Sequence, residues 1–415
     1  MSYKIVQHET RWNVGVVKEP LIHRIHAYPA KFPAFITEKA VAVARENGVC
    51  VRTVADVFCG CGTTAYEAKK LGLNFWGCDI NPVATLIARV KSSSHDIDEI
   101  KLAFEEIKLR YAKYLREVDC GDVPERLKYW FEEERQRELK ALLLSIRALP
   151  NVAVREFFTV AFSNILKATS RWLAKSIKPQ VDPSKITHDA WTEFSKQVTF
   201  MIKAVEQAGL RPKGKTQIKT KNLLTVSARS ALADVIVTSP PYVTSYEYAD
   251  LHQLSTLWLG YASDYRTLRK GTIGSMFRER ESSSNQTSLN CVGRDIIACL
   301  READKSKASA SERYFRDMAK TVEKCKSILR PGGMVFFVIG DTEYKGVKVK
   351  NSEFLAQCMV DQGFENVTME KRQITGKILT PYRNEKGRFS KDHNAAMKIY
   401  AEEYVLMGRK SNVGN

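Results

Sequence analysis

A strand that ends in two consecutive prolines restricts the fold of this chain more than any other feature of its sequence. Residues 234–237 form an apolar run typical of a buried strand, and Thr238-Ser239-Pro240-Pro241-Tyr242 follows it. Proline has no N–H to donate and restricts the residue before it, so the strand cannot continue through this pair. We therefore predict a stiff loop at the carboxyl end of a strand, where open α/β sheets bind their ligands.

The chemistry of this loop suits a nucleobase. It offers the hydroxyl of Ser239, prolyl carbonyls that accept hydrogen bonds, and the aromatic face of Tyr242. A flat molecule with an exocyclic amino group could use all three. The alternative is a Pro-Pro turn beside a buried tyrosine, because such proline pairs are common in turns.

A second constellation precedes the loop and predicts a nucleoside-bearing cofactor. An expected strand over residues 53–58 leads into glycines 60 and 62, and a helix follows over residues 65–71. Glycines at such a turn let a ligand approach the backbone. A second strand over residues 74–78 ends at Asp79, about 20 residues after the first strand, where a carboxylate can accept both hydroxyls of a ribose. A glycine packing turn, or a dinucleotide site, would be the alternative for these residues alone.

The two constellations together resemble the amino-group DNA methyltransferases that use S-adenosylmethionine. Residues 58–64 (Phe-Cys-Gly-Cys-Gly-Thr-Thr) resemble the cofactor loop of that family, and Ser239 to Tyr242 resemble its catalytic motif in the spelling of the cytosine-N4 enzymes. Adenine-N6 relatives usually carry Asp or Asn in the place of Ser239. Residues 26–32 resemble the family element beside the methionine end of the cofactor.

The sequence departs from the family pattern at three positions. Val57 stands where the family often has Pro, and Cys61 stands where it often has Ser. Ser227 follows an expected strand over residues 223–226, at a position where relatives often place an acidic residue near the adenine. We therefore assign Ser227 no role in binding the cofactor.

The resemblance implies a set of site residues and no metal. The implied catalytic residues are Ser239, Pro240, Pro241 and Tyr242. Ser239 Oγ and the Pro240 carbonyl would hold the two amino hydrogens of the base, and Tyr242 would stack on the extracted base. The implied cofactor-binding residues are His26, Tyr28, Lys31, Asp56, Phe58, Cys59, Gly60, Gly62, Thr63, Thr64, Asp79 and Ile80.

The predicted fold is an α/β, Rossmann-like class I methyltransferase sheet, mostly parallel with an antiparallel last strand, carrying a helical insertion. Residues 1–91 would hold an N-terminal arm, the methionine-end element and the cofactor-binding half. Residues 92–215 form the helical insertion, a candidate for target recognition, and residues 216–415 form the catalytic half with basic loops that face DNA. In that half we expect an exposed stretch over residues 262–310 and a long helix over residues 311–329.

A net charge of +18 and a pI of about 9.4 favour a polyanionic partner. Double-stranded DNA is the first candidate, and an anionic membrane surface or a merely basic solvated surface is the alternative. The candidate DNA-binding residues lie in three basic segments: Lys213, Lys215, Arg266, Arg269, Lys270, Arg278, Arg280, Arg383, Lys386 and Arg388.

The nine cysteines indicate neither a zinc site nor a disulfide framework, because no Cys-x-x-Cys pair occurs and the count is odd. The sequence shows no signal-peptide pattern and no apolar run long enough to span a bilayer. We expect a cytoplasmic protein, associated with the nucleoid when it is bound to DNA, and no membrane partner. A cognate restriction endonuclease encoded nearby is a possible partner without a stable complex.

These observations favour a site-specific methyltransferase that modifies cytosine N4 in duplex DNA, by base flipping, in a restriction–modification system. One alternative keeps the fold and changes the target to adenine N6. Another is an RNA base (guanine-N2) methyltransferase. A fourth hypothesis, a nucleic-acid-binding protein on a decayed methyltransferase fold, is disfavoured by the intact glycine loop and by Asp79.

Overall fold

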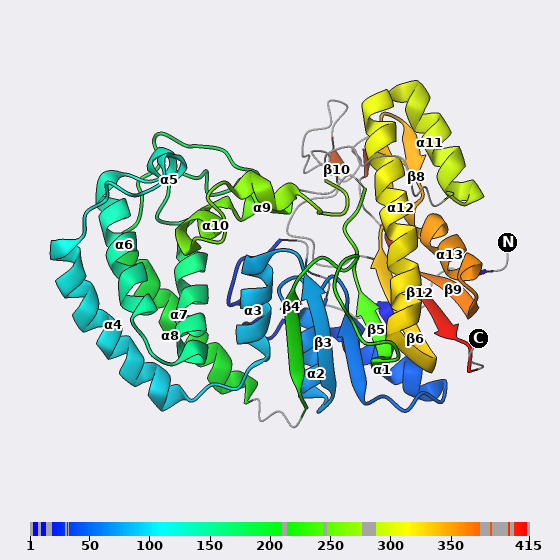
Figure 1. The fold of residues 1–415 in the computed structure, drawn as a ribbon, viewed down its shortest axis with the longest axis horizontal. Helices are drawn as coiled ribbons and strands as arrows, with labels where there is room; N and C mark the ends of the chain where they lie inside the picture. Colours follow the sequence, from blue (N-terminus) through cyan, green and yellow to red (C-terminus); the bar gives the residue numbers. More distant parts are fainter. Residues whose placement is uncertain are drawn as a thin grey trace.

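An eight-stranded sheet forms the centre of the molecule, in the order β1-β9-β12-β6-β5-β2-β3-β4 (Figure 1). The computed structural model describes residues 3–6, 10–13, 19–29, 31, 33–209, 214–243, 247–275, 288–373, 382–383, 397–398 and 402–412. The strands of the sheet are β1 (Lys4–Val6), β2 (Thr53–Asp56), β3 (Asn74–Asp79), β4 (Thr216–Thr220), β5 (Ala233–Thr238), β6 (Leu329–Ile339), β9 (Phe364–Gln373) and β12 (Glu402–Lys410). Two short hairpins pair β7 (Thr342–Tyr344) with β8 (Val347–Val349) and β10 (Tyr382–Arg383) with β11 (Met397–Lys398).

The strand directions confirm the predicted Rossmann-like sheet. Strands β4, β3, β2, β5 and β6 run parallel to one another. The last strand, β12, pairs antiparallel with both β6 and β9. The strand order reverses between β2 and β5, and such a switch point opens a crevice at the carboxyl ends of the strands.

Helices cover both faces of the sheet because apolar residues alternate along its strands. On β5, Val235 and Val237 pack in the same cluster as α1 (Phe35–Glu46) and α2 (Thr63–Lys70), whereas Ile236 packs in the cluster of the opposite face. That face is covered by α11 (Cys291–Ala303), α12 (Lys305–Ile328) and α13 (Asn351–Asp361).

The segment predicted as a helical insertion is largely helical in the structure, and its core is continuous with α3 (Pro82–Ser92) and α10 (Gln253–Leu259). It contains α4 (Ile97–Glu117), α5 (Glu125–Trp130), α6 (Glu133–Arg147), α7 (Val152–Ile165) and α8 (Ala190–Ala208). Phe157, Phe158 and Phe194 are fully buried in a cluster that extends to α3 and to α10. The aromatic residues of the insertion therefore mainly fill this core, and the insertion lies beyond the β4 edge of the sheet, with α3 between it and β4 (Figure 1).

The expected strand over residues 223–226 is wrong, and the strand lies earlier, at β4. Asn222 explains the difference, because its side-chain oxygen accepts from the Leu224 N–H at 2.9 Å and its carbonyl accepts from the Val226 N–H at 2.8 Å. These bonds form a local turn that removes the donors a strand would need. β4 is an edge strand with one pairing partner, so its polar and charged residues remain compatible with the sheet.

Three further segments are more ordered than the sequence indicated. The N-terminal arm contains β1, which pairs parallel with β9, and Trp12, which is fully buried and donates to Glu370. The stretch over residues 262–310 contains α11 and the 3₁₀ helix η3 (Tyr265–Arg269). Helix α12 begins at Lys305 rather than near residue 311, because the Asp304 side chain caps it and accepts from the Lys307 N–H at 3.0 Å.

The carboxylate of Asp56 joins three elements at the switch point of the sheet. One oxygen accepts from Thr238 Oγ1 at 2.7 Å, at the end of β5, and from the Phe58 N–H at 3.1 Å. The other oxygen accepts from Thr64 Oγ1 at 2.8 Å, in the first turn of α2. Asp56 is 1% exposed, so it fixes these elements from within the core and does not face solvent.

Replacement of Asp56 should separate its packing role from its charge. Asp56→Ala leaves the buried hydroxyls of Thr64 and Thr238 without their acceptor, and each such loss costs about 1–3 kcal/mol. Asp56→Asn keeps an acceptor for Phe58 and Thr238, and the Thr64 hydroxyl can rotate to accept from the new amide. Urea unfolding should show a loss of several kcal/mol for Ala and a much smaller loss for Asn. Equal losses in the two variants would contradict this role.

Burial also gives Asp56 a characteristic pH dependence. Desolvation raises the pKa of this carboxyl to about 6 from its ordinary value of 3.8, against the opposing effect of its three donors. The folded state therefore binds the proton more tightly than the unfolded state, and the contribution of Asp56 to stability falls as the pH rises from about 4 to about 6. The difference in unfolding free energy between wild type and Asp56→Asn should change over that window. A constant difference would show that the carboxyl does not titrate there.

Candidate active site

A cavity lies at the carboxyl ends of β2, β3, β4 and β5 and encloses about 860 Å³ of empty space, including its mouth. The loops after these strands, the short helix α9 (Tyr248–Leu251) and the segment after η3 form its walls. The lining residues are Tyr28, Val57, Phe58, Gly60, Asp79, Ile80, Asn81, Lys221, Asn222, Leu223, Ser239, Pro241, Tyr248, Ala249, Leu268, Gly271, Thr272 and Ile273.

Asp79 and Gly60 form one wall of the cavity. The two oxygens of Asp79 accept from the Gly60 N–H and from the Asn81 N–H, each at 2.9 Å. Burial raises the pKa of the Asp79 carboxyl, and the two N–H donors oppose that shift. Each carboxylate oxygen has more than one lone-pair site, so Asp79 can still accept ligand hydroxyls. Gly60 has a φ of +46°, in the left-handed region that favours glycine.

Several residues predicted to bind the cofactor support the glycine loop from behind. Gly62 has a φ of +76°, and an added Cβ would lie 2.6 Å from the Ala88 Cα, so this glycine allows α2 to approach α3. Cys59, Thr63 and Thr64 are buried and do not line the cavity, and the same is true of Asp56. The structure therefore gives these residues a positioning role in the loop.

Ser239 and Pro241 form the opposite wall. Ser239 Oγ donates to the Val338 carbonyl on β6 at 2.9 Å, so its hydroxyl proton is engaged and its lone pairs remain as acceptors. The Tyr314 hydroxyl donates to the Pro241 carbonyl at 2.9 Å and holds the loop in place. Pro240 is buried and does not line the cavity.

Tyr242 is held beside the cavity by a carboxylate on β12. Its hydroxyl donates to Glu403 Oε1 at 3.3 Å, and the other oxygen of Glu403 lies 3.3 Å from Nε of the buried Arg372. Burial, together with the Glu403 charge, raises the pKa of Tyr242 well above its ordinary value. Tyr242 therefore remains a neutral phenol whose ring orientation is fixed from its hydroxyl end.

Of the predicted methionine-end element, Tyr28 reaches the cavity and stacks on His252, with ring centroids 5.1 Å apart. His26 Nε2 lies 2.9 Å from Ser163 Oγ in α7, and burial lowers the pKa of His26 to about 3. Lys31 forms an ion pair with Glu19 at 2.8 Å. The structure thus places His26 against the helical insertion and Lys31 outside the cavity wall.

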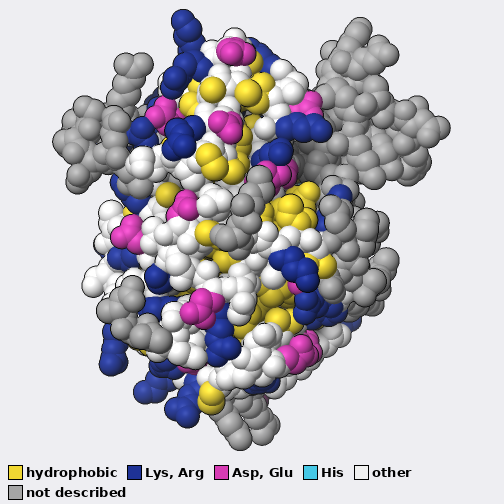
Figure 2. All heavy atoms as spheres, turned by 90° about the vertical axis from the view of Figure 1, so that its right-hand side faces the viewer, with side chains coloured by type: hydrophobic (Ala, Val, Ile, Leu, Met, Phe, Trp, Pro, Cys, Tyr) yellow, Lys and Arg dark blue, Asp and Glu magenta, His cyan; other side chains and the backbone are white. Residues whose placement is uncertain are grey.

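The predicted DNA-binding residues are only partly within the described structure. Lys213, Arg278, Arg280, Lys386 and Arg388 lie outside the described residues, and only the backbone of Arg383 is described. Lys215 and Lys270 are exposed. Figure 2 shows basic and acidic side chains interspersed over the described part of one face, with no single basic stripe.

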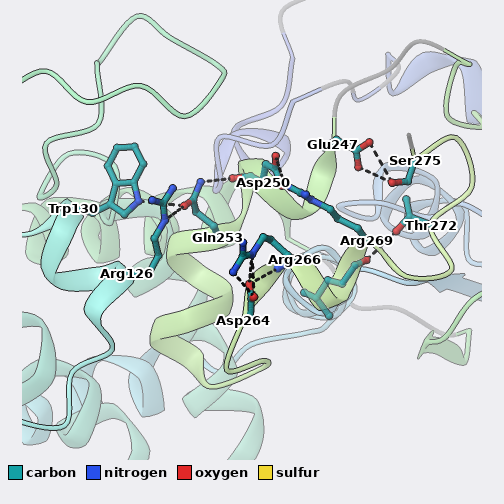
Figure 3. Close-up of polar contacts among 11 residues, drawn as sticks. Arg126, Trp130, Glu247, Asp250, Gln253, Asp264, Arg266, Arg269, Thr272 and Ser275 are labelled. Carbon is teal, nitrogen blue, oxygen red and sulfur yellow. Dashed lines mark hydrogen bonds and ion pairs between the residues drawn. The ribbon is translucent and has the colours of Figure 1, made fainter. Parts of the chain in front are cut away.

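Two of the predicted DNA contacts already have carboxylate partners (Figure 3). Arg269 makes a bidentate contact with Asp250 through hydrogen bonds of 2.7 and 2.9 Å, and its side chain is 16% exposed. Arg266 pairs with Asp264 at 2.8 Å and remains exposed. Arg269 therefore fastens η3 to α9, whereas Arg266 remains accessible to a ligand.

Sequence reasoning missed two walls of the cavity. The first follows β4 and includes Asn222, whose side chain donates to the Gly271 carbonyl at 2.8 Å. The expected strand over residues 223–226 concealed this wall, and the position assigned to Ser227 at the end of that strand was wrong for the same reason. The available signal was an Asn two residues after the alternating segment 216–220. The second wall, around residues 268–273, carried no motif that would have indicated it.

The described residues contain no group of three or more His, Cys, Asp or Glu side chains placed to hold a metal ion. They also include no helix whose length and apolar character would allow it to cross a membrane.

Comparisons with known proteins find similarity to DNA methylases and to type II methyltransferases. A family model described as DNA methylase (N6_N4_Mtase) matches residues 2–89. The type II methyltransferase M.MvaI of Kocuria varians is 21% identical over 93% of this chain and 90% of its own length. The type II methyltransferase M.AvaI of Anabaena variabilis is 23% identical over 75% of this chain and 73% of its own length.

A solved S-adenosylmethionine-dependent methyltransferase from Methanosarcina mazei aligns with 86% of this chain and 92% of its own, at 9% identity and a TM-score of 0.30. The family match covers the glycine loop and Asp79, and the curated relatives extend across both halves of the sheet. Residues 2–89 therefore match the DNA methylase family model, and most of the chain is similar to type II methyltransferases.

Proposed function

We propose that this protein transfers the methyl group of S-adenosylmethionine to the exocyclic N4 amino group of cytosine in duplex DNA. The observation that carries the proposal is the shared cavity: Gly60 and Asp79 line one side of it and Ser239 and Pro241 line the other. A cofactor and an extracted base could therefore meet at this one open cavity.

The residues of the cavity fit S-adenosylmethionine, the cofactor of the family. Asp79 offers carboxylate oxygens to ribose hydroxyls, and Gly60 presents backbone without a side chain. Ile80 and Leu268 supply apolar surface beside them for the adenine. When bound, this cofactor supplies an electrophilic methyl group, and the protein needs to position the acceptor nitrogen in front of it.

Ser239 would prepare the acceptor nitrogen. The lone pair of a cytosine amino group is delocalised into the ring, so the nitrogen is a poor nucleophile. A hydrogen bond from the amino group to Ser239 Oγ would favour a more pyramidal nitrogen and would strengthen as positive charge develops during attack. The Pro240 carbonyl could take the second N–H only after a shift of the loop, because Pro240 does not line the cavity. The Val338 carbonyl keeps the Ser239 proton away from the acceptor, so Ser239 presents lone pairs.

Tyr242 would hold the extracted base. A base inside the duplex cannot reach the cavity, so it must be flipped out and stacked. The hydrogen bond from Tyr242 to Glu403 fixes the ring orientation before the base arrives. No covalent intermediate is required: the amino nitrogen would attack the methyl carbon as the bond between that carbon and the sulfonium sulfur breaks, the thioether product would leave, and the nitrogen would release one proton to solvent.

The serine at position 239 favours cytosine over adenine N6, and the description of the matching family model, DNA methylase, favours DNA over RNA. The alternative is transfer to adenine N6, which would keep the fold, the cofactor and the cavity and change only the target base. We also propose that the protein acts in a restriction–modification system, since the relatives are type II methyltransferases. The cognate endonuclease would then be a separate protein.

Nucleoside analysis tests the identity of the base. Incubation of the protein with duplex DNA and cofactor labelled on its methyl group, followed by enzymatic digestion and mass spectrometry, should yield N4-methylcytosine. N6-methyladenine as the sole product would replace the cytosine assignment and leave the amino-methyltransferase mechanism intact. Label on tRNA and none on duplex DNA would overturn the assignment of DNA as the substrate.

Ser239→Ala should lower kcat by about 10²–10³-fold, the usual effect of losing one acceptor or donor that acts in the transition state. The affinity for cofactor, measured by calorimetry, should stay unchanged because Asp79 and Gly60 are intact. Ser227→Ala is the matched control: Ser227 is exposed and does not line the cavity, and its replacement should leave kcat unaltered. Near-wild-type kcat in Ser239→Ala would contradict the role of the hydroxyl.

A further inference from the structure

The helical insertion is almost neutral, although the whole chain carries a net charge of +18. Residues 92–209 contain 19 Lys and Arg against 18 Asp and Glu. Bulk charge therefore gives the insertion no general affinity for a polyanion. Any contact between this insertion and DNA must depend on individual cations that carboxylates do not neutralise.

Arg126 in α5 is such a cation, and its side chain is held in place. Its guanidinium carbon lies 5.1 Å from the ring centroid of Tyr129, 5.5 Å from that of Trp130 and 5.8 Å from that of Tyr265. Its Nε donates to Gln253 Oε1 at 3.0 Å (Figure 3). Contacts with three rings and one hydrogen bond restrict both the position and the orientation of the guanidinium.

The terminal nitrogens of Arg126 have no carboxylate within ion-pair distance among the residues that the structure describes. Cations nearby differ in this respect: Lys128 pairs with Glu125 at 2.6 Å, and Arg266 pairs with Asp264 at 2.8 Å. Arg126 is exposed, and its Nε alone is used by Gln253. The fork of the guanidinium is therefore ordered and directed by protein contacts while its charge remains available.

The same contacts connect Arg126 to the wall of the active-site cavity. Gln253 is fully buried, and its Nε2 donates to the Asp250 carbonyl at 3.0 Å in α9. That helix contributes Tyr248 and Ala249 to the wall. Tyr265 begins η3, and Leu268, one 3₁₀ turn later, lines the cavity.

We propose that Arg126 binds a backbone phosphate of the duplex beside the extracted base. The inference rests on the proposed function, because it takes DNA as the substrate. An Arg guanidinium matches a phosphate through two parallel N–H···O bonds, and an ordered guanidinium loses little side-chain entropy when it binds. Such a contact positions the duplex over the cavity without reading its sequence.

The test is the salt dependence of DNA binding by Arg126→Ala, measured as fluorescence anisotropy of a labelled duplex. The plot of log K against log salt concentration has a negative slope, and loss of one phosphate contact makes that slope shallower by about 0.9. We expect affinity to fall by about 3–30-fold at low salt, to the same extent on cognate and unrelated duplexes, since a contact to phosphate carries no sequence information. Arg126→Lys should keep the slope and lose part of the affinity.

Arg137→Ala is the matched control. Arg137 is exposed on α6 of the same insertion, and its guanidinium donates to the Leu115 carbonyl on α4. Its replacement should change neither the affinity nor the slope. Calorimetry with S-adenosylmethionine and a thermal melt of each variant check that the cavity and the fold are preserved.

Three results would overturn the inference, and they are distinguishable. Wild-type affinity and slope in Arg126→Ala would show that the guanidinium does not contact DNA. Weaker binding with an unchanged slope would show that Arg126 only fastens α5 to α10 and η3. If the wild-type protein binds no duplex at any salt concentration, the proposed function fails as well.

Discussion

The hydrogen bonds that Thr238 and Thr64 donate to Asp56 hold together the two sides of the switch point. Asp56 ends β2, and Thr238 ends β5, so one buried carboxylate sets the separation of the two loops that follow them. One loop carries Gly60, and the other carries Ser239. The distance between a cofactor and its acceptor would therefore be determined in the core, by a residue that does not touch the cavity.

The remaining walls of the cavity are held by polar contacts between segments that are distant in the sequence. Asp250 holds Arg269, and Asn222 holds the Gly271 carbonyl, so the segment after η3 stays against the end of β4. Gln253 receives hydrogen bonds from both Arg126 and Trp130 of the insertion. The helical insertion and the cavity wall thus share α9 and α10 as a common support (Figure 3).

The sequence predicted the parts of the site that local chemistry specifies. Glycines after a strand, an acidic residue at the end of the next strand and a Ser-Pro-Pro loop each restrict their own backbone, and the structure places Gly60, Asp79 and Ser239 around one cavity. It did not predict which residues face the ligand. Thr64 and Gly60 belong to one motif, yet Thr64 turns into the core because Asp56 needs a donor there.

The walls that sequence reasoning missed depend on long-range contacts and on an edge strand. A strand with one neighbour tolerates polar residues, so β4 lacks the apolar run that marked β5. The Arg269–Asp250 pair joins residues 19 positions apart, and no periodicity in the sequence predicts such a pair. His26 faces Ser163 of the insertion for a similar reason, since only the tertiary fold brings those two residues together.

The central claim is that cofactor and base meet in the cavity between Asp79 and Ser239. A crystal structure of the protein with S-adenosylhomocysteine and a duplex that carries the target base tests it most directly. The account predicts ribose hydroxyls within hydrogen-bond distance of Asp79 and the amino group of an extracted cytosine against Ser239 Oγ. A cofactor bound outside this cavity, or a target base whose amino group faces away from Ser239, would contradict it.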